Sequence, residues 1–295
     1  MRPFRFGVNL TALGERDSWL AQCRTAEQLG YDVLTVSDHL GGQSPFPALA
    51  AAAAVTERVR LGTFVLNCAF WNPVLLAREV FTAGRLTGGR LELGLGTGYV
   101  RSEFDRAGLE WGTAGQRVDR LAATVAELVR LLDHPRELGV ATAPPRPTLV
   151  LGGNGDRVLE LAARYADVVS FSAAVLKPGA TRGSLELLDA EAVQERTEYF
   201  ARAAGDRAAA VERNVLAQTV VVTDDPDAAI AALRRRMPKL TGRRLADVPT
   251  VLVGSPAGIA DRLRERRERY GISYVCVQES VMYEFAPVVA LLSGR

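Results

Sequence analysis

The chain has 295 residues, of which 48% are hydrophobic and 24% charged, and its formal net charge is +2. These values are ordinary for a soluble globular protein, and so small a charge gives no indication of a nucleic-acid or membrane partner. The three cysteines are far apart and contain no CxxC pair, which argues against a disulfide framework and a zinc site. The longest apolar run, residues 48–55, is too short to span a membrane. We therefore expect a reduced, cytoplasmic protein without a bound metal.

Strand and helix patterns alternate along the first half of the chain, which enters its first strand without a signal-peptide pattern. A loop is expected after the fourth strand, through Trp111. Strands are predicted at residues 4–10, 33–38, 60–67, 90–96 and 148–152, and helices at 17–29, 47–56, 73–86 and about 118–132.

The same alternation continues to the end of the chain. Strands are predicted at residues 167–172, 215–222 and 273–278, and helices at 156–165, 191–204, 226–236, 256–270 and 284–292. Residues 173–206 are predicted to be an insertion after strand six, with a loop at Lys177-Pro178-Gly179. Eight strands, most of them followed by a helix, predict one α/β domain over residues 1–295, a closed (β/α)8 TIM barrel. The alternative is an open doubly wound sheet.

The second strand ends in the pair Asp38-His39. The loops after the strands of a (β/α)8 barrel form its active face, so this pair is expected there. Because an imidazole titrates near neutral pH, His39 is predicted to handle a proton or a developing charge, with Asp38 bonding a polar ligand or the backbone. The alternative is a turn-forming Asp beside a half-exposed His.

A glycine-rich stretch, GLGTG at residues 94–98, follows the fourth strand. Its spacing does not match the dinucleotide fingerprint G-x-G-x-x-G. Missing side chains predict close approach of the backbone to a flat ligand, and the alternative is a tight turn at a barrel corner.

A second glycine-rich stretch, GGNGDR at residues 152–157, follows the fifth strand and opens a helix. Bare backbone N–H groups at a helix N-terminus bind anions, so this stretch is predicted to hold a phosphate. Arg157 is expected to reach the same anion, and Asp156 to cap the helix. The alternative is a glycine-rich turn.

Trp71, after strand three, is expected either to line a pocket for a planar ligand or to pack against the next helix.

Taken together and in order, several segments resemble the bacterial-luciferase-like flavin and deazaflavin oxidoreductases, and most closely their branch that depends on coenzyme F420. The similarity covers nearly the whole chain. It is carried by AEQLGYD (26–32) leading into SDH (37–39), LGTFVLN (61–67) with Asn72-Pro73, GGRLELGLGTG (88–98), GGNG (152–155) with AARYAD (162–167), and VGSP (253–256) with YGISY (270–274).

The resemblance implies a (β/α)8 barrel, a homodimer and a cofactor ring at His39 and Asp38. It also implies a non-proline cis peptide at Phe64–Val65 against the back of the ring, and a phosphate held by residues 153–155. The expected cofactor-binding residues are Phe64, Val65, Asn67, Gly96, Thr97, Gly98, Gly152, Gly153, Asn154, Gly155 and Arg157. The residues expected to line the substrate space are Asn9, Trp71 and Tyr99.

The chain departs from the F420-dependent sugar-phosphate dehydrogenases that it resembles. They place a Glu proton donor directly after Gly-Thr-Gly, where this chain has Tyr99, and a Trp after the Asp-His pair, where it has Leu40-Gly41-Gly42-Gln43. A sugar phosphate is therefore not the expected substrate. We expect hydride transfer between F420 and another small organic molecule. The alternatives are an FMN-dependent monooxygenase of the same fold and a non-catalytic barrel that binds a ligand or a partner.

Overall fold

A computed structural model describes residues 1–11, 14–176, 185–236 and 247–295 of the chain. Eight parallel strands close into a barrel, as predicted, because β3 and β4, two parts of the third strand, both pair with β5. The barrel strands are β1 (Arg5–Leu10), β2 (Val33–Val36), β3 (Arg60–Thr63), β4 (Leu66–Asn67), β5 (Leu91–Gly96), β6 (Thr148–Gly152), β7 (Val168–Phe171), β10 (Glu212–Leu216) and β13 (Ile272–Gln278).

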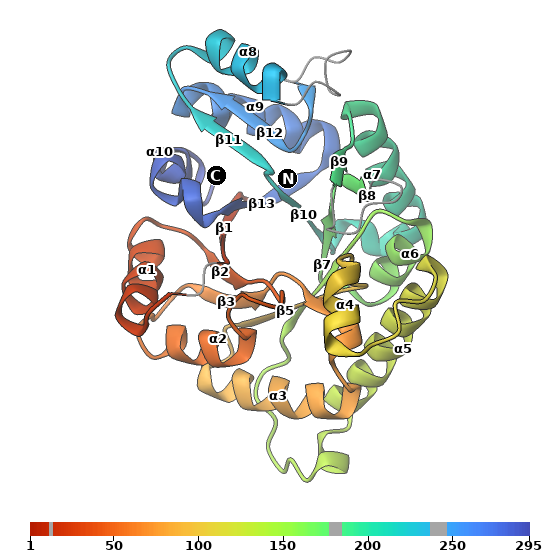
Figure 1. The fold of residues 1–295 in the computed structure, drawn as a ribbon. Helices are drawn as coiled ribbons and strands as arrows, with labels where there is room; N and C mark the ends of the chain where they lie inside the picture. The colour runs from red at the N-terminus through yellow and green to blue at the C-terminus, as the bar shows by residue number, and fades with distance from the viewer. Residues whose placement is uncertain (12–13, 177–184, 237–246) are drawn as a thin grey trace.

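Helices surround the strands (Figure 1). Within the described ranges, no helix combines the length and the apolar content that crossing a bilayer requires. The helices are α1 (Arg16–Gln28), α2 (Pro45–Ala53), α3 (Pro73–Leu86), α4 (Arg101–Ala107), α5 (Ala114–Asp133), α6 (Asp156–Tyr165), α7 (Ala190–Ala204), α8 (Pro226–Arg236), α9 (Pro256–Tyr270) and α10 (Met282–Leu292).

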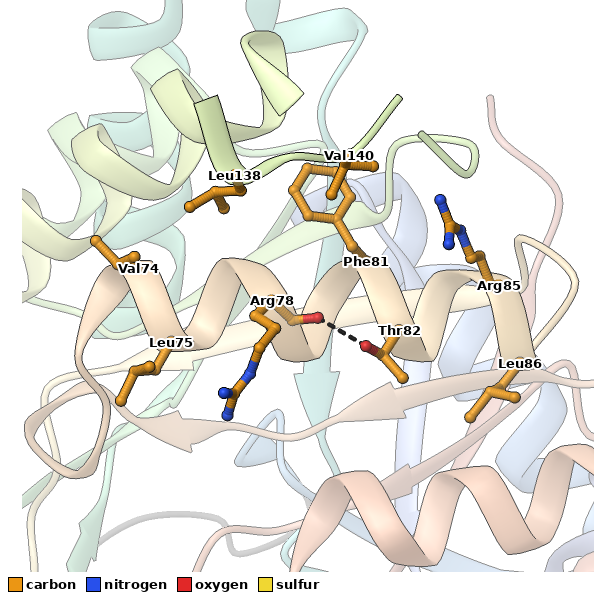
Figure 2. Close-up of a pocket in the computed structure, with 9 residues that line it drawn as sticks. All are labelled: Val74, Leu75, Arg78, Phe81, Thr82, Arg85, Leu86, Leu138 and Val140. Atoms are coloured by element: carbon orange, nitrogen blue, oxygen red, sulfur yellow. Dashed lines mark hydrogen bonds between the residues drawn. The ribbon is translucent and has the colours of Figure 1, made fainter. Parts of the chain in front are cut away.

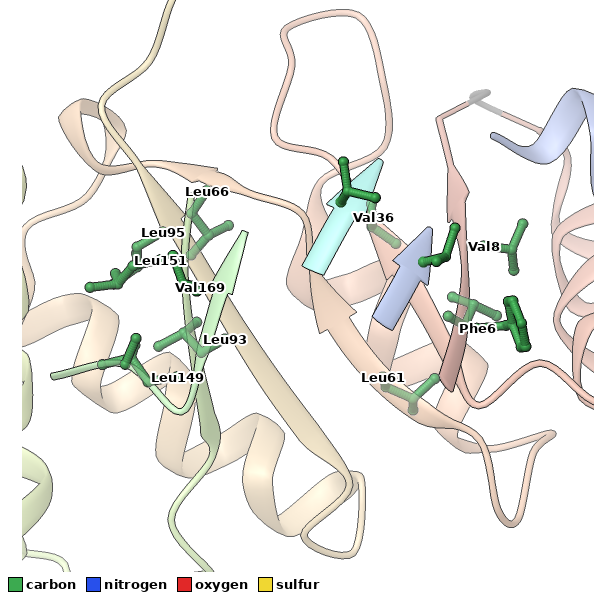
Figure 3. Packing of buried hydrophobic residues seen from close by; sticks show 14 of the residues in the cluster. Phe6, Val8, Val36, Leu61, Leu66, Leu93, Leu95, Leu149, Leu151 and Val169 are labelled. Atoms are coloured by element: carbon green, nitrogen blue, oxygen red, sulfur yellow. The ribbon is translucent and has the colours of Figure 1, made fainter. Parts of the chain in front are cut away.

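The alternation of side chains along each strand divides the core into two parts. One set of strand residues belongs to the large apolar cluster that also contains the buried faces of the helices, and Figure 3 shows part of it, including Phe6, Leu93 and Leu151. A second, smaller cluster includes Val150, Tyr274 and Cys276 from alternate strand positions. All three cysteines, Cys23, Cys68 and Cys276, are free and buried, so they pack as small hydrophobic side chains.

The predicted loop after the fourth strand is wrong, because it contains α4. This helix has only seven residues and ends at Gly108, which adopts a left-handed conformation with φ 68°. One apolar side chain, Phe104, anchors the helix; it is fully buried and lies against the ring of Trp111 at a centroid distance of 4.9 Å. A single anchor creates no periodic apolar stripe, so the pattern did not show a helix.

The prediction of strand seven over residues 215–222 is also wrong in its bounds. The barrel strand is β10, whereas β11 (Thr219–Val222) leaves the barrel and pairs with β12 (Val251–Gly254), a strand that was not predicted. The apolar run followed in the sequence misses the start of β10, where Glu212 and Arg213 are charged. Glu212 is accommodated because it lies 3.4 Å from Arg5 in an ionic cluster at this end of the barrel, and Arg213 donates a 2.8 Å hydrogen bond to Tyr270 O.

The segment between β7 and β10 departs from the barrel repeat less than predicted. Its helix, α7, fills the usual place of the helix between two successive barrel strands. The added elements are two strands that pair antiparallel, β8 (Ala174–Leu176) and β9 (Leu185–Leu187). The predicted loop at residues 177–179 lies outside the described residues.

An ionic cluster fills the N-terminal end of the barrel. Oε1 of Glu92, in β5, accepts hydrogen bonds of 2.7 Å from both Arg5 Nη2 and Arg60 Nε. Arg5 also lies 3.4 Å from Glu212, and its guanidinium carbon lies 4.6 Å from the ring centroid of Tyr274. Burial alone would lower the pKa of Arg5, but Glu92, Tyr274 and Glu212 raise it above its ordinary value. The charges of the two arginines therefore depend on Glu92.

Replacement of Glu92 by Gln is expected to lower the free energy of unfolding by about 3 kcal/mol, because the partly buried guanidinium groups of Arg5 and Arg60 lose the buried carboxylate that they share. Urea unfolding measures the loss. The matched control is Glu127→Gln, which breaks a pair with Arg130 on the exposed face of α5 and should leave the midpoint unchanged. Equal losses in the two variants would contradict a special role for the buried cluster.

Candidate active site

The predicted site residues that end successive strands meet at the C-terminal mouth of the barrel. All strands of the barrel are parallel, so the segments after β2, β4, β5 and β6 emerge on one face. Asp38 and His39 follow β2, Thr97 to Tyr99 follow β5, and residues 153–155 follow β6. The topology therefore brings the expected ring and phosphate segments to the same end of the molecule.

His39 is held between two side chains. Its Nδ1 lies 3.0 Å from Oε1 and 3.2 Å from Oε2 of Glu103, and its Nε2 lies 3.4 Å from the hydroxyl of Tyr99. The rings of His39 and Tyr99 meet edge to face, with centroids 5.5 Å apart. The histidine thus has an acid partner, which the sequence analysis did not find.

The sequence does not indicate Glu103 as a partner of His39, because it predicts a loop where the structure has α4. The side chain of Glu103 is 13% exposed, compared with 39% for His39. The only signal in the sequence was a carboxylate four residues after Tyr99, about one helical turn away. Without the helix, this spacing does not turn Glu103 back toward the second strand.

Asp38 organises the backbone beside His39. Its Oδ2 accepts hydrogen bonds from the backbone N–H of Asn67 at 3.1 Å and from Nε1 of Trp71 at 2.9 Å. Burial raises the pKa of Asp38 above its usual range, although these two donors and His39 act in the opposite direction. The carboxylate is therefore a structural acceptor that ties the end of β2 to the end of β4.

The bond between Phe64 and Val65 is cis, as the resemblance implied, and both side chains are half-buried. The glycines of the stretch after β5 pack against this part of the third strand. A Cβ atom at Gly96 would lie 2.7 Å from Cγ2 of Val65, and one at Gly98 would lie 2.7 Å from Cγ of Asn67. The protein's own packing thus requires these glycines. Their contact with a ligand stays a prediction.

The stretch after β6 leaves backbone donors free at the N-terminus of α6. In the described part of the chain, the backbone N–H groups of Asn154 and Gly155 donate no hydrogen bond to protein atoms. Gly155 is the N-cap, and a Cβ atom there would have no heavy atom within 4 Å. The side chain of Asn154 is fixed by Ala174 O at 2.9 Å and by the N–H of Ala173 at 3.2 Å. The geometry suits an anion.

Two arginines lie near this helix terminus. Arg157 forms an ion pair with Asp119 of α5, so its predicted role as an anion ligand stays a prediction. Arg196 of α7, which the sequence analysis did not single out, contacts Asp156 and donates a 3.2 Å hydrogen bond to Asn154 O. Arg196 therefore fixes the loop from the side of α7. Asp156 is the first residue of α6 and not its cap.

The residues expected at the substrate differ in their exposure. Asn9 is 4% exposed, and its Oδ1 accepts a 3.1 Å hydrogen bond from Thr35. The ring of Trp71 packs edge to face against Phe46, with centroids 5.2 Å apart. Tyr99 is 41% exposed. No group of three or more His, Cys, Asp or Glu side chains suited to a metal ion occurs among the described residues.

The structure is a closed parallel (β/α)8 barrel. Its mouth carries a histidine, a cis peptide and a helix N-terminus with unused N–H donors. The family model of the luciferase-like monooxygenases matches residues 1–274. The chain belongs to the luciferase-like monooxygenase family.

Three known proteins illustrate the similarity. An F420-dependent glucose-6-phosphate dehydrogenase from Kribbella flavida is 44% identical over 115 residues, which cover 36% of this chain and 34% of that enzyme. The F420-dependent tetrahydromethanopterin reductase from Methanopyrus kandleri superposes with a TM-score of 0.72 at 16% identity, covering 99% of this chain and 98% of the reductase. The oxygenating constituent of 3,6-diketocamphane monooxygenase from Pseudomonas putida, in complex with FMN, has a TM-score of 0.70 at 15% identity, covering 99% and 98%.

The match to curated relatives is partial. The chain spans 34% of the length of the Kribbella flavida enzyme, and 55% of an enzyme of the same name from Nakamurella multipartita. The structural matches, at 16% and 15% identity, establish the fold.

Replacement of Asp38 by Ala is expected to lower the free energy of unfolding by about 2 to 4 kcal/mol, because two donors lose their shared acceptor. Asp38→Asn retains an oxygen in the same place and should keep most of this stability. Urea unfolding of both variants measures the difference. Equal destabilisation by the two substitutions would show that the charge of Asp38, and not its acceptor geometry, is what matters.

Proposed function

We propose that this protein is an oxidoreductase that transfers a hydride between coenzyme F420 and a small organic substrate. The observation that carries the proposal is the pair of free N–H groups at the N-terminus of α6, on the same face of the barrel as His39. The F420 dependence in the names of the curated relatives supports the choice of cofactor. Tyr99 stands where the resembling sugar-phosphate dehydrogenases carry Glu, so we propose a different substrate.

The residues at the mouth fit a ligand with a flat ring and a phosphate. The amides of Asn154 and Gly155 supply donors for the phosphate, and the dipole of α6 adds to the attraction. Phe64 and Val65 offer a half-buried surface for a ring, and His39 and Tyr99 lie at the same mouth. When bound, F420 would supply a ring carbon that accepts or releases a hydride. The protein supplies orientation and proton handling.

Gly155→Asp tests the phosphate assignment. A carboxylate there opposes an anion, and an interaction of a few kcal/mol predicts binding of F420 weakened by about 100-fold or more. The fold should tolerate the change, because Gly155 has φ −68° and Asp is a favoured N-cap. Gly155→Asn is the matched control for size and should bind F420 nearly as well as the unaltered protein. Fluorescence titration with F420 measures affinity. Unchanged binding in the Asp variant would contradict the assignment.

FMN is the competing cofactor, since a structural neighbour of this chain was solved with FMN. Spectral titration of the protein with F420 and with FMN separates the two. We expect tight binding of F420. Tight binding of FMN without binding of F420 would favour a monooxygenase and overturn the proposal.

We also propose that the protein works in the cytoplasm as a homodimer. Helix α3 exposes Leu75 (51%) and Leu86 (60%) beside a groove of about 340 Å³. Figure 2 shows both side chains on one side of the helix, with Leu138 and Val140 across its other side. Eleven residues are about three turns, so an antiparallel pairing of two α3 helices about a twofold axis would place each Leu75 opposite a Leu86.

Sedimentation is expected to give twice the chain mass of 31.8 kDa. The double substitution Leu75→Glu with Leu86→Glu should yield monomers, because it places charge in the apolar contact. Leu291→Glu, at a leucine 39% exposed on α10, is the control and should leave the dimer intact. A dimer that survives the double substitution would place the contact elsewhere.

A further inference from the structure

Three side chains at the barrel mouth stand in a row: Tyr99, His39 and Glu103. The Tyr99 hydroxyl lies 3.4 Å from Nε2 of His39, and Nδ1 of His39 lies 3.0 Å from Oε1 of Glu103. Tyr99 is exposed, whereas His39 and Glu103 are partly buried. Tyr99 is therefore the member of the row that is most open to solvent, and Glu103 at the other end belongs to α4.

The hydrogen-bond partners of His39 indicate which of its ring nitrogens carries the proton in the absence of substrate. A carboxylate accepts and does not donate, so Nδ1 of His39 carries the proton that Glu103 accepts. Nε2 of a neutral imidazole is then an acceptor, and the Tyr99 hydroxyl donates to it. Burial and the nearby Glu103 raise the pKa of Tyr99, so its phenol keeps its proton at neutral pH. The three groups form one directional chain of hydrogen bonds.

We propose that Tyr99, His39 and Glu103 form a proton relay, in which Tyr99 exchanges the proton with the substrate and Glu103 is a positioning residue. Glu103 fixes the Nδ1–H tautomer of His39 and stabilises the imidazolium that forms during transfer. This inference rests on the proposed hydride transfer with F420, for which it identifies the proton path.

The transfer balances in both directions. When a substrate alcohol is oxidised, its hydroxyl proton passes to the Tyr99 oxygen while the Tyr99 proton passes to Nε2 of His39. Oxidised F420, when bound, would accept the carbon-bound hydrogen as a hydride, and a carbonyl product would remain. In the reverse direction, Nε2 would return its proton to Tyr99, and Tyr99 would protonate the carbonyl oxygen as its carbon receives the hydride that reduced F420 would supply. Tyr99 is neutral before and after.

The other charged groups near the row are engaged elsewhere. The carboxylate of Asp38 accepts from Asn67 and Trp71, and not from the imidazole. On α4, Arg101 lies 3.9 Å from Asp105, and both are exposed. Glu103 is therefore the acid that contacts the ring of His39.

Nitrogen NMR of the histidine rings tests the relay in the unliganded protein. The chain has two histidines, so His134 serves as an internal reference in every spectrum. We expect the neutral ring of His39 to carry its proton on Nδ1. Glu103→Met should abolish this preference, and Tyr99→Phe should shift the Nε2 signal while Nδ1 stays protonated. Asp105→Asn, an exposed carboxylate on the same helix, is the control and should change neither signal.

Kinetics provide the second readout, with secondary alcohols and ketones as the probes. Tyr99→Phe and Glu103→Met should each lower kcat about 100-fold, the typical contribution of a positioned acid–base group, with little change in KM or in F420 affinity. Glu103→Gln, which keeps an acceptor of the same length, should retain the Nδ1–H tautomer but still lower kcat, because the imidazolium loses its counter-charge.

The outcomes separate the relay from the cofactor assignment. A proton on Nε2 of His39 in the unaltered protein, or ring signals that ignore both Tyr99→Phe and Glu103→Met, would overturn the relay even if F420 binds. Failure to bind F420, with the NMR result as expected, would instead reject the cofactor and leave the hydrogen-bonded row in place.

Discussion

The carboxylate of Asp38 connects the parts of the mouth. By accepting from Asn67 N–H and Trp71 Nε1, it joins the end of β2 to the end of the third barrel strand. The Asn67 side chain lies so close to Gly98 that no Cβ fits there, and the chain then leads through Tyr99 into α4. Glu103 on α4 returns to His39, the neighbour of Asp38. Contacts therefore lead from Asp38 through Asn67 and α4 back to His39, and each residue limits the position of the next.

The two ends of the barrel use charge in different ways. At the N-terminal end, Glu92 is buried and its Oε1 is shared by Arg5 and Arg60, so its charge is paired within the protein. At the C-terminal end, the amides of Asn154 and Gly155 keep unused donors, and Tyr99 remains exposed. Charges that pair within the protein stabilise the fold, whereas unused donors and exposed polar groups are available to a ligand. This contrast agrees with the usual division of a (β/α)8 barrel into a stabilising end and an active end.

Much of the architecture could be predicted from the sequence, because alternating strand and helix patterns impose parallel pairing. The failures occur where a local pattern was too weak to indicate the element. Helix α4 rests on the single apolar side chain Phe104. Strand β10 begins with the charged residue Glu212, whose partner Arg5 is distant in the sequence. The strand ends were enough to place Asp38, His39 and the residues after β6 at the barrel mouth, whereas Glu103 and Arg196 lie on helices and reach it only through the tertiary fold.

The acid partner of His39 comes from a helix and not from the residue directly after Gly-Thr-Gly. The resembling dehydrogenases carry a carboxylate directly after Gly-Thr-Gly, and this chain has Tyr99 there. The acid has not been lost from the site, since Glu103 reaches His39 from the first turn of α4. A carboxylate behind the imidazole stabilises its charged form, while a phenol in front of it remains protonated until a base accepts its proton. Under the proposed function, Tyr99 would be the group that meets the substrate, and Glu103, one helical turn away, would act through His39.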